Sequence, residues 1–263
     1  MTTSVRDLRE QGFGATERRD AWWIGPALTA LVLGSFAIYA TWAAWVNRNF
    51  EWGPYLSPFY SPLINAGWWP LSPAFLILVF PLGFRATCYY YRKAYYRAFF
   101  LDPVACAVGE PRHDYRGETK FPFILQNIHR FFMYAAVIFI VILSYDVWVA
   151  TRWPVNGVLA NGASAAGPTQ FGVGVGTLVM ALNVILLSCY TFGCHSLRHL
   201  VGGQVDCFSC ARGGKARYRT WRGVSVLNRY HQLFAWCSLF SVALTDLYIR
   251  LCAMGVIHDL RIL

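Results

Sequence analysis

Five long apolar stretches separated by polar segments dominate the chain. They run from Trp22 to about Val46, from Pro73 to about Phe100, from Phe121 to about Ala150, from Phe171 to about Leu200 and from Leu227 to about Val256. A helix needs about 20 mostly apolar residues to cross the hydrocarbon core of a bilayer. The pattern therefore predicts an all-α integral membrane bundle of five transmembrane helices.

This pattern also predicts the domain organisation. We expect an N-terminal tail over residues 1–21, a five-helix transmembrane anchor domain over residues 22–256 and a short outer tail over residues 257–263. The tail is polar and shows no cleavable signal pattern. No internal repeat and no soluble domain is visible. We expect Pro81 to kink the second helix and none of the five helices to be broken.

The basic residues predict the orientation of the bundle. Of the 23 Lys and Arg residues, 17 fall in the N-terminal tail, in the loops after the second and fourth stretches or at the ends of the stretches beside these loops, and two, Arg85 and Arg130, fall within the spans. Four lie on the opposite side: Arg48, Arg152, Arg250 and Arg261. Lys and Arg favour the cytoplasmic side of a membrane. We therefore expect a multi-pass protein of the inner cell membrane with its N-terminus in the cytoplasm.

Composition supports the membrane class. Hydrophobic residues make up 56% of the chain and charged residues 14%, whereas soluble domains carry about 25% charged residues. The net charge of +10 does not indicate a nucleic-acid partner, because the basic residues are scattered in loops beside apolar stretches. The eight cysteines show no regular framework, so we expect no disulfide bonds. The C-x-x-C at residues 207–210 is a weak zinc signal, since no second pair accompanies it.

Four histidines and two cysteines fall at the predicted inner ends of the apolar stretches. They are His129, His195, His199, His231, Cys88 and Cys194. One such histidine can be an interfacial residue bonded to a carbonyl, and one such cysteine is often a small buried hydrophobe. Polar groups inside a membrane are costly and usually functional, so the whole set indicates redox chemistry within the bilayer.

Four strings of residues, at 85–91, 117–122, 126–130 and 193–203, carry a resemblance to a known family that covers nearly the whole chain. By these strings the chain resembles the membrane-anchor subunit of respiratory complex II, which is succinate dehydrogenase or fumarate reductase, and within that family a haem-poor subgroup of single-chain anchors. The resemblance implies that a flavoprotein subunit oxidises succinate and that an iron–sulfur subunit docks on the inner loops. This chain would hold the quinone. It contains neither a Rossmann glycine fingerprint nor a ferredoxin cysteine run, so the flavin chemistry belongs to another chain.

Departures from the family change the expected cofactor. The common five-helix anchor binds two haems, each between two histidines. The first stretch here has no histidine, which excludes an outer haem, and the second stretch has Cys88 where an inner haem would need a histidine. Two Cys and two His form the ligand set of a Rieske [2Fe–2S] cluster, whose raised potential suits donation to a quinone. The C-x-H…C-x-x-H loops of Rieske domains are absent.

The expected cluster ligands and quinone donors follow from this interpretation. We assign sulfur to Cys88 and Cys194, with Cys106 as the alternative. Nitrogen comes from two of His129, His199 and His231, with His195 as a further candidate. Six residues are expected, from their sequence positions, to lie at the same depth in the membrane and to bind the quinone: Arg85, Tyr90, Gln126, Arg130, Trp221 and Tyr230. Each of these could instead contact lipid phosphate or pack in an aromatic belt.

Two other hypotheses remain open at this stage. The first is a mono-haem b anchor of the same complex, in which two of the four inner histidines ligate the iron. The second is a redox-inactive membrane protein, such as an assembly factor or a transporter. Transporters often contain internal repeats and broken helices, and the sequence predicts neither.

Overall fold

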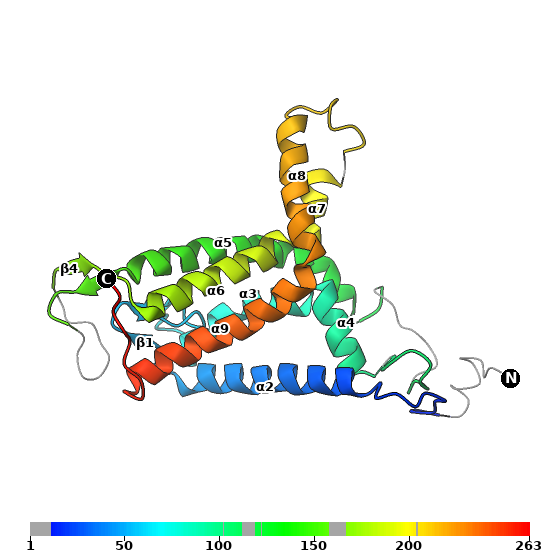
Figure 1. Cartoon of the computed structure of the whole chain (residues 1–263), viewed down its shortest axis with the longest axis horizontal. Helices are drawn as coiled ribbons and strands as arrows, with labels where there is room; N and C mark the ends of the chain where they lie inside the picture. Colours follow the sequence, from blue (N-terminus) through cyan, green and yellow to red (C-terminus); the bar gives the residue numbers. More distant parts are fainter. Residues whose placement is uncertain (1–11, 102, 112–118, 122, 158–166, 204) are drawn as a thin grey trace. The chain divides into compact units, whose positions relative to one another are not determined.

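The computed structural model describes residues 12–101, 103–111, 119–121, 123–157, 167–203 and 205–263 (Figure 1). These residues form two compact units. The first contains the chain up to Tyr39 and residues Arg85–His129, and the second contains Ala40–Phe84 and Arg130–Leu263.

The first unit contains the start of α2 (Ile24–Val46), the helix α4 (Tyr89–Ala98) and the 3-10 helix η1 (Phe123–Ile128). The backbone of the N-terminal segment hydrogen-bonds to a later loop of the same unit. Gly14 N–H donates to Gly109 O at 3.0 Å, and Gly109 N–H donates to Ala15 O at 2.8 Å. These bonds hold the entry to α2 against the segment that follows α4.

The second unit contains the end of α2, α3 (Pro73–Ala86) except its last two residues, and α5 (His129–Val149) except its first residue. It also contains α6 (Val175–Phe192), α7 (His195–Gly202), α8 (Gly214–Arg229) and α9 (His231–Ala253). Helices α6 and α9 pack along each other, while α7 and α8 pair and extend away from them (Figure 1). Two short antiparallel pairs lie at the other end of the unit. They are β1 (Glu51–Trp52) with β2 (Tyr55–Leu56), and β3 (Arg152–Pro154) with β4 (Thr169–Phe171).

A small core joins the hairpins to the long helices of the second unit. Tyr55, Ala150, Trp153, Met180 and Ile249 form one buried cluster. It brings the loop after α2 together with the end of α5 and with α6 and α9. These contacts fix the end of the unit that lies opposite the paired helices α7 and α8.

The long helices have the length and surface of membrane spans. In the described part of the chain, α2, Ile124–Val149, α6 and α9 are each long and apolar enough to cross a membrane, and α3 with α4 adds a fifth span if the pair counts as one. Large apolar side chains cover their outer faces, including Ile38, Val141 and Leu182, which are all more than half exposed. In water such a surface would be unfavourable, and in a bilayer it contacts lipid. The predicted all-α membrane bundle is therefore confirmed.

The expectation of continuous helices was wrong at two places. The second apolar stretch breaks between Ala86 and Tyr89, and the fourth breaks between Phe192 and His195. The short helices that follow, α4 and α7, are rich in Arg, Lys, His and Tyr. A segment with this many charges is costly in hydrocarbon, which explains why neither one continues the apolar helix before it. Helix α3 itself runs through Pro81 without ending there.

Two further expectations about the loops were also wrong. The segment after α7 is not an open loop, because α8 occupies Gly214–Arg229. Cys207 and Cys210 in the same segment form a disulfide, although the irregular cysteine spacing predicted none. The two cysteines are close in sequence and lie in a turn, so their pairing needs no wider framework.

Arg250, which the charge count placed on the outer side, does not reach the surface. It lies within α9 and is 1% exposed. Its Nε donates to the Asp246 carboxylate at 2.8 Å, one helical turn earlier. Its terminal nitrogens donate to the backbone oxygens of Arg48 at 2.7 Å and Ala43 at 2.9 Å. Ser57 donates a further hydrogen bond to Asp246. Arg250 therefore stabilises the C-terminal end of α2 instead of marking a side of the membrane.

Candidate functional site

The break between α3 and α4 places Cys88 directly before the first residue of α4. Its backbone is extended, with φ −69° and ψ 133°, and its N–H donates to Arg85 O at 3.1 Å. Its carbonyl accepts from Arg92 N–H at 2.8 Å, which is the first hydrogen bond of the new helix. The residue is only 2% exposed. The positive end of a helix dipole favours negative charge, so this position suits a metal-bound thiolate.

His129 lies beside the same break. Sequence reasoning placed it two turns inside a helix, but it is the first residue of α5 and follows η1. Thr87 Oγ1 and His129 Nδ1 are 2.8 Å apart and share a hydrogen bond. A partner on one ring nitrogen fixes the ring's orientation, as partners of metal-ligating histidines do. Thr87 was missed because a single hydroxyl next to a cysteine gives no sequence signal.

A chain of polar groups connects α4 to η1. Arg92 Nη1 donates to Gln126 Oε1 at 3.0 Å, and Gln126 Nε2 donates to the Tyr95 hydroxyl at 3.1 Å. Tyr95 in turn donates to the backbone oxygen of Ala86 at 3.2 Å. Both ends of the Gln126 amide are thereby oriented. Arg92 and Tyr95 were not among the predicted site residues, because in a run of aromatic and basic residues the sequence does not mark which ones face inward.

Arg85 and Tyr90 lie on either side of Cys88. The buried Arg85 donates from Nη1 to the Tyr91 hydroxyl at 2.6 Å, and its guanidinium carbon lies 5.4 Å from the centre of that ring. Tyr90 packs against Tyr89 with ring centres 5.8 Å apart. The Arg85 guanidinium is therefore held in place three residues before the buried thiol of Cys88.

The break between α6 and α7 repeats this local structure in the second unit. Cys194 has φ −62° and ψ 138°, and it precedes the first residue of α7. Its N–H donates to Thr191 O at 3.2 Å, and its carbonyl accepts from Arg198 N–H at 3.0 Å. The residue is fully buried at 0% exposure. Cys88 and Cys194 thus occupy equivalent positions at two separate helix breaks.

His231 is the first residue of α9 and is 1% exposed. Its ring stacks on Tyr190 with centres 4.8 Å apart and planes 17° apart. Tyr190 also contacts Phe84, with ring centres 5.2 Å apart. A buried imidazole therefore lies at the start of a spanning helix in the second unit, as His129 does at the end of the first.

Gly193 allows α9 to begin close to the second break. A Cβ at this position would lie 2.8 Å from Cys189 O, 3.1 Å from Leu227 O and 3.2 Å from His231 Nδ1. Asn228 strengthens the approach by donating to Gly193 O at 2.8 Å. The glycine is needed here for space, since its backbone conformation suits any residue.

Replacing Gly193 by alanine should therefore disturb this break. We expect G193A to lower the free energy of unfolding by about 1–3 kcal/mol, because two backbone oxygens cannot move aside as a flexible side chain would. Gly223 in α8 is the matched control, since a Cβ at that position would have no described atom within 4 Å. G223A should leave stability unchanged or raise it by up to about 1 kcal/mol. Equal thermal unfolding curves for the two variants would contradict the close-packing argument.

The remaining predicted residues lie around α7 and α8. His195 and His199 are both exposed on α7, and Arg130 Nη2 lies 3.2 Å from His199 Nδ1. Trp221 packs on α8 against Phe208 and Tyr218, with ring centres 5.9 and 6.1 Å away. Tyr230 is exposed between α8 and α9. The structure thus brings Arg130 and His199 into direct contact.

The predicted metal ligands are divided between the units. Cys88 and His129 belong to the first unit, whereas Cys194, His195, His199 and His231 belong to the second. Cys106, the alternative sulfur, is exposed in the first. Within the described ranges, no three His, Cys, Asp or Glu side chains are grouped closely enough to hold a metal ion. Each unit nevertheless offers one buried thiol at a helix start and one imidazole at the start of a spanning helix, which are the donor types that a Rieske-type cluster uses.

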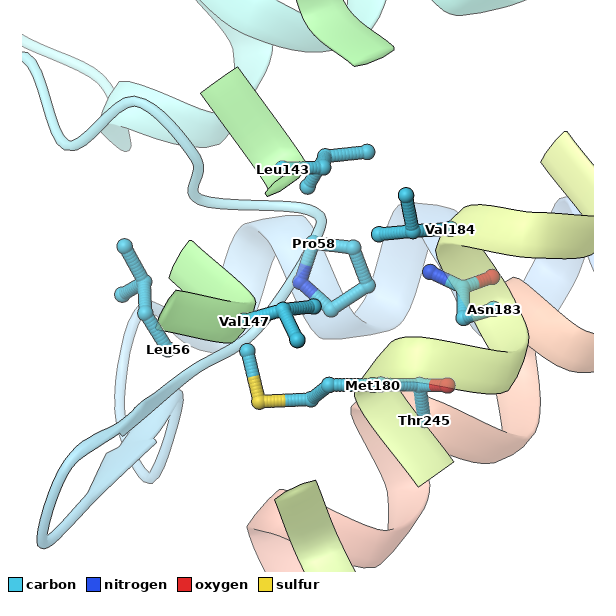
Figure 2. Close-up of a pocket in the computed structure, with 8 residues that line it drawn as sticks. All are labelled: Leu56, Pro58, Leu143, Val147, Met180, Asn183, Val184 and Thr245. Carbon is cyan, nitrogen blue, oxygen red and sulfur yellow. The ribbon is translucent and has the colours of Figure 1, made fainter. Parts of the chain in front are cut away.

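A small pocket in the second unit lies away from these residues. Its lining comes from β2, the segment after it, α5, α6 and α9. Figure 2 shows the eight residues: Leu56, Pro58, Leu143, Val147, Met180, Asn183, Val184 and Thr245. The lining is mostly apolar, and no predicted quinone or metal residue is among it. The pocket therefore does not correspond to the candidate site.

Comparisons with known proteins identify the family. The model of the family described as "Actinobacterial succinate dehydrogenase subunit SdhC" matches residues 24–255. The chain belongs to this family. It is a membrane-anchor subunit of succinate dehydrogenase, which confirms the resemblance inferred from the sequence and makes the chain part of an enzyme complex.

A solved structure agrees with this assignment. The chain is similar to one from the Mycobacterium smegmatis Sdh1 complex in the apo form, with 44% sequence identity, a TM-score of 0.82 and 94% of each chain covered. No curated protein matched the chain. Because the chain belongs to this family, the alternative hypothesis of an unrelated transporter or assembly factor is wrong.

Proposed function

We propose that this anchor subunit forms the site at which a membrane quinone is reduced, and that residues at its two helix breaks hold a Rieske-type [2Fe–2S] cluster. The observation that carries the proposal is the repeated local structure of Cys88 and Cys194. Both are buried, and both begin a short polar helix directly after an apolar one. Buried thiols at helix starts suit anionic ligands, whereas packing alone would not require two equivalent positions.

Burial narrows the choice of ligands. Cys88 and Cys194 would supply the thiolates. His129, half-buried and held by Thr87, and His231, almost fully buried, would supply the imidazoles. His195 and His199 are exposed and are therefore the weaker candidates. A cluster bound in this way would supply one-electron transfer at a potential raised by its imidazole ligands.

The quinone would be bound and oriented by polar groups near the breaks. Reduction places negative charge on the quinone oxygens, and fixed cations and hydrogen-bond donors stabilise such charge. Arg85 and the Arg92–Gln126–Tyr95 chain provide these groups in the first unit, and the Arg130–His199 pair provides them in the second. Tyr90, Trp221 and Tyr230 remain proposed contacts, since aromatic side chains can form the apolar walls of a quinone site.

The proposed partners are an iron–sulfur subunit and a flavoprotein subunit of the same complex. The similar chain belongs to a complex described as Sdh1. The exposed basic residues of α8 favour docking of the iron–sulfur subunit on that helix, because complementary charge orients a partner; they are Lys215, Arg219, Arg222 and Arg229. By the distribution of Lys and Arg, this side faces the cytoplasm, and the membrane is the inner cell membrane.

Electron paramagnetic resonance of the purified, reduced complex tests the cofactor. We expect a Rieske-type signal in the wild-type complex and its loss in C88S and in C194S. C237S is the matched control, because Cys237 lies within α9 away from either break, and it should keep the signal. A wild-type complex without this signal would refute the cluster. Reduced Soret and α bands in its optical spectrum would instead support the mono-haem b anchor.

A further inference from the structure

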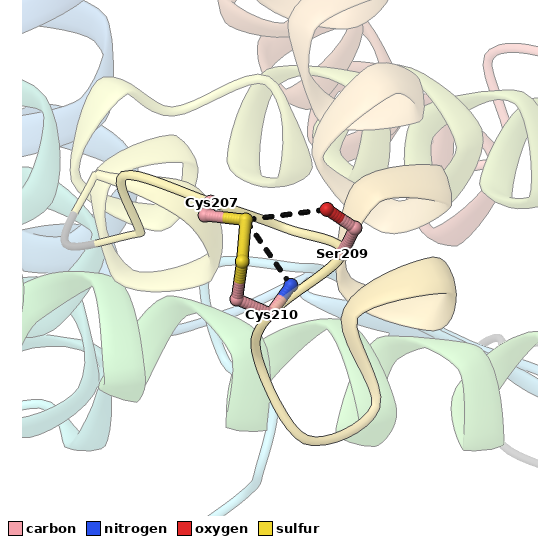
Figure 3. The surroundings of a disulfide bond; sticks show 3 residues. All are labelled: Cys207, Ser209 and Cys210. Atoms are coloured by element: carbon pink, nitrogen blue, oxygen red, sulfur yellow. Dashed lines mark hydrogen bonds between the residues drawn. A yellow bond between two sulfur atoms is a disulfide. The ribbon is translucent and has the colours of Figure 1, made fainter.

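The segment between α7 and α8 carries a disulfide that the proposed quinone site does not use. Cys207 and Cys210 are bonded, and Figure 3 shows two polar groups directed at one of the two sulfurs. Cys210 N–H donates to Cys207 Sγ at 3.2 Å, and the Ser209 hydroxyl lies 3.2 Å from the same atom and can donate to it. The two sulfurs are therefore not equivalent.

The surroundings strengthen this difference. Cys210 is exposed, whereas Cys207 is half-buried. The turn lies directly before α8, and the missing side chain of Gly214 lets the Phe208 carbonyl approach that helix start. Arg212 and Lys215 follow within a few residues and are exposed, so they add positive charge to the turn as a whole. Hydrogen-bond donors stabilise a thiolate, and both of the donors described above are directed at Cys207 Sγ. A thiolate at Cys207 would thus be the better leaving group, and Cys210 Sγ the more accessible point of attack.

We propose that Cys207 and Cys210 form a reversible thiol–disulfide site that low-molecular-weight thiols of the cytoplasm reduce. The thiolate of the reductant bonds to Cys210 Sγ, the bond between the two cysteines breaks, and Cys207 leaves as a thiolate. A second reductant thiolate then attacks the reductant sulfur of the mixed disulfide and releases Cys210. In total, one protein disulfide and two thiols give two cysteine thiols and one reductant disulfide. The cytoplasmic location rests on the orientation that we proposed for the anchor.

Phe208 connects this chemistry to the paired helices. It lies inside the ring that the disulfide closes, and its side chain packs against Tyr218 and Trp221 of α8, with ring centres 5.4 and 5.9 Å away. Trp221 also lies under the Arg198 guanidinium of α7, 5.2 Å from the ring centre. Reduction opens the ring and gives Phe208 more freedom. The thiol state of the cytoplasm would therefore set the order of the α7–α8 pair, which carries many of the exposed basic residues.

Differential alkylation with mass spectrometry tests the site in the intact complex. The complex is equilibrated in buffers with increasing ratios of reduced to oxidised glutathione. We expect Cys207 and Cys210 to become accessible to the alkylating reagent together as the ratio rises, and to become protected again when the ratio is lowered. In C210S, Cys207 should react with iodoacetamide at neutral pH about tenfold faster than Cys210 does in C207S, because it has the larger thiolate fraction. C106S is the matched control, since Cys106 is an exposed cysteine of the other unit, and it should leave the titration unchanged.

Several results would overturn the proposal. The disulfide would not form if both cysteines were alkylated in every oxidising buffer, and it would not be reversible if no thiol reduced it in the folded complex. Equal alkylation rates of Cys207 in C210S and of Cys210 in C207S would contradict the difference between the two sulfurs. One bound zinc ion per chain that is lost in C207S would show a metal site instead. The orientation is checked separately with a membrane-impermeant maleimide after reduction. Labelling in inverted vesicles but not in spheroplasts supports a cytoplasmic site, and the opposite pattern refutes it. The spectroscopic test of the cluster is independent of all these readouts, so either proposal can fail alone.

Discussion

Replacing His129 by alanine should lower quinone reduction by more than about 100-fold while succinate oxidation by an artificial dye continues. The dye takes electrons from the partner subunits before they reach the anchor. His129 lies at the start of α5, and its ring is oriented by the buried Thr87. Removal of the imidazole deletes a proposed cluster ligand, so the loss should appear only in the step that uses the membrane quinone. Steady-state assays of both activities on the same purified complex measure the difference.

Two further variants make this result specific. T87V keeps the shape of the threonine but removes the hydroxyl that orients the ring, and we expect a loss of about 10–100-fold in quinone reduction. N127A changes an exposed neighbour and should alter either activity by no more than about twofold. Unchanged quinone reduction in H129A would contradict the proposed role. A parallel loss of dye reduction would mean that the complex had failed to assemble.

Replacing Arg250 by alanine should lower the free energy of unfolding by about 3–5 kcal/mol. The Arg250–Asp246 pair is almost completely buried, with 2% and 0% of the two side chains exposed. The variant would leave the Asp246 carboxylate buried without its cation, and the backbone oxygens of Ala43 and Arg48 would lose their donors. An unpaired charge in a low-dielectric interior costs far more than an exposed ion pair contributes.

Thermal unfolding of the detergent-solubilised complex measures this effect. R152A is the matched control, since Arg152 is exposed at the same end of the unit and its guanidinium lies over the face of Trp148. It should change stability by no more than about 0.5 kcal/mol. The double variant R250A/D246A should regain part of the loss, because the uncompensated carboxylate is gone. Equal stability of R250A and R152A would show that the buried pair is not needed.

Sequence reasoning found the spans because lipid imposes a simple rule. A helix in hydrocarbon must be apolar over about 20 residues, and this requirement is visible without any knowledge of packing. The same reasoning failed at Cys88 and Cys194, where the helices break. A span is recognised from the average hydropathy of about 20 residues. This average hardly changes at the two or three residues where the helix ends and the backbone becomes extended, so it does not reveal the break.

The partners in the polar network at the other end of the second unit could not be read from the sequence either. Arg250 was counted among the residues of the outer side, since an arginine near the end of an apolar stretch normally reaches the interface. Its partners are the Asp246 carboxylate and the backbone oxygens of Ala43 and Arg48, and the Ser57 hydroxyl donates to Asp246. Apart from the Arg250–Asp246 bond, which spans one helical turn, the bonds in this network join groups 189 to 207 residues apart, and no local pattern connects such distant positions.

By itself, the sequence determined the membrane class, the number of candidate spans and the family, together with the cysteines and histidines that could serve as ligands. These properties depend on composition and on local strings of residues. Only the tertiary structure decided that Cys88 and Cys194 begin short helices after breaks, that Thr87 orients His129, that Cys207 bonds to Cys210 and that Arg250 is buried. These properties depend on which groups fold against one another, because the cost of burying a charge or an imidazole is set by partners that the chain brings together only on folding.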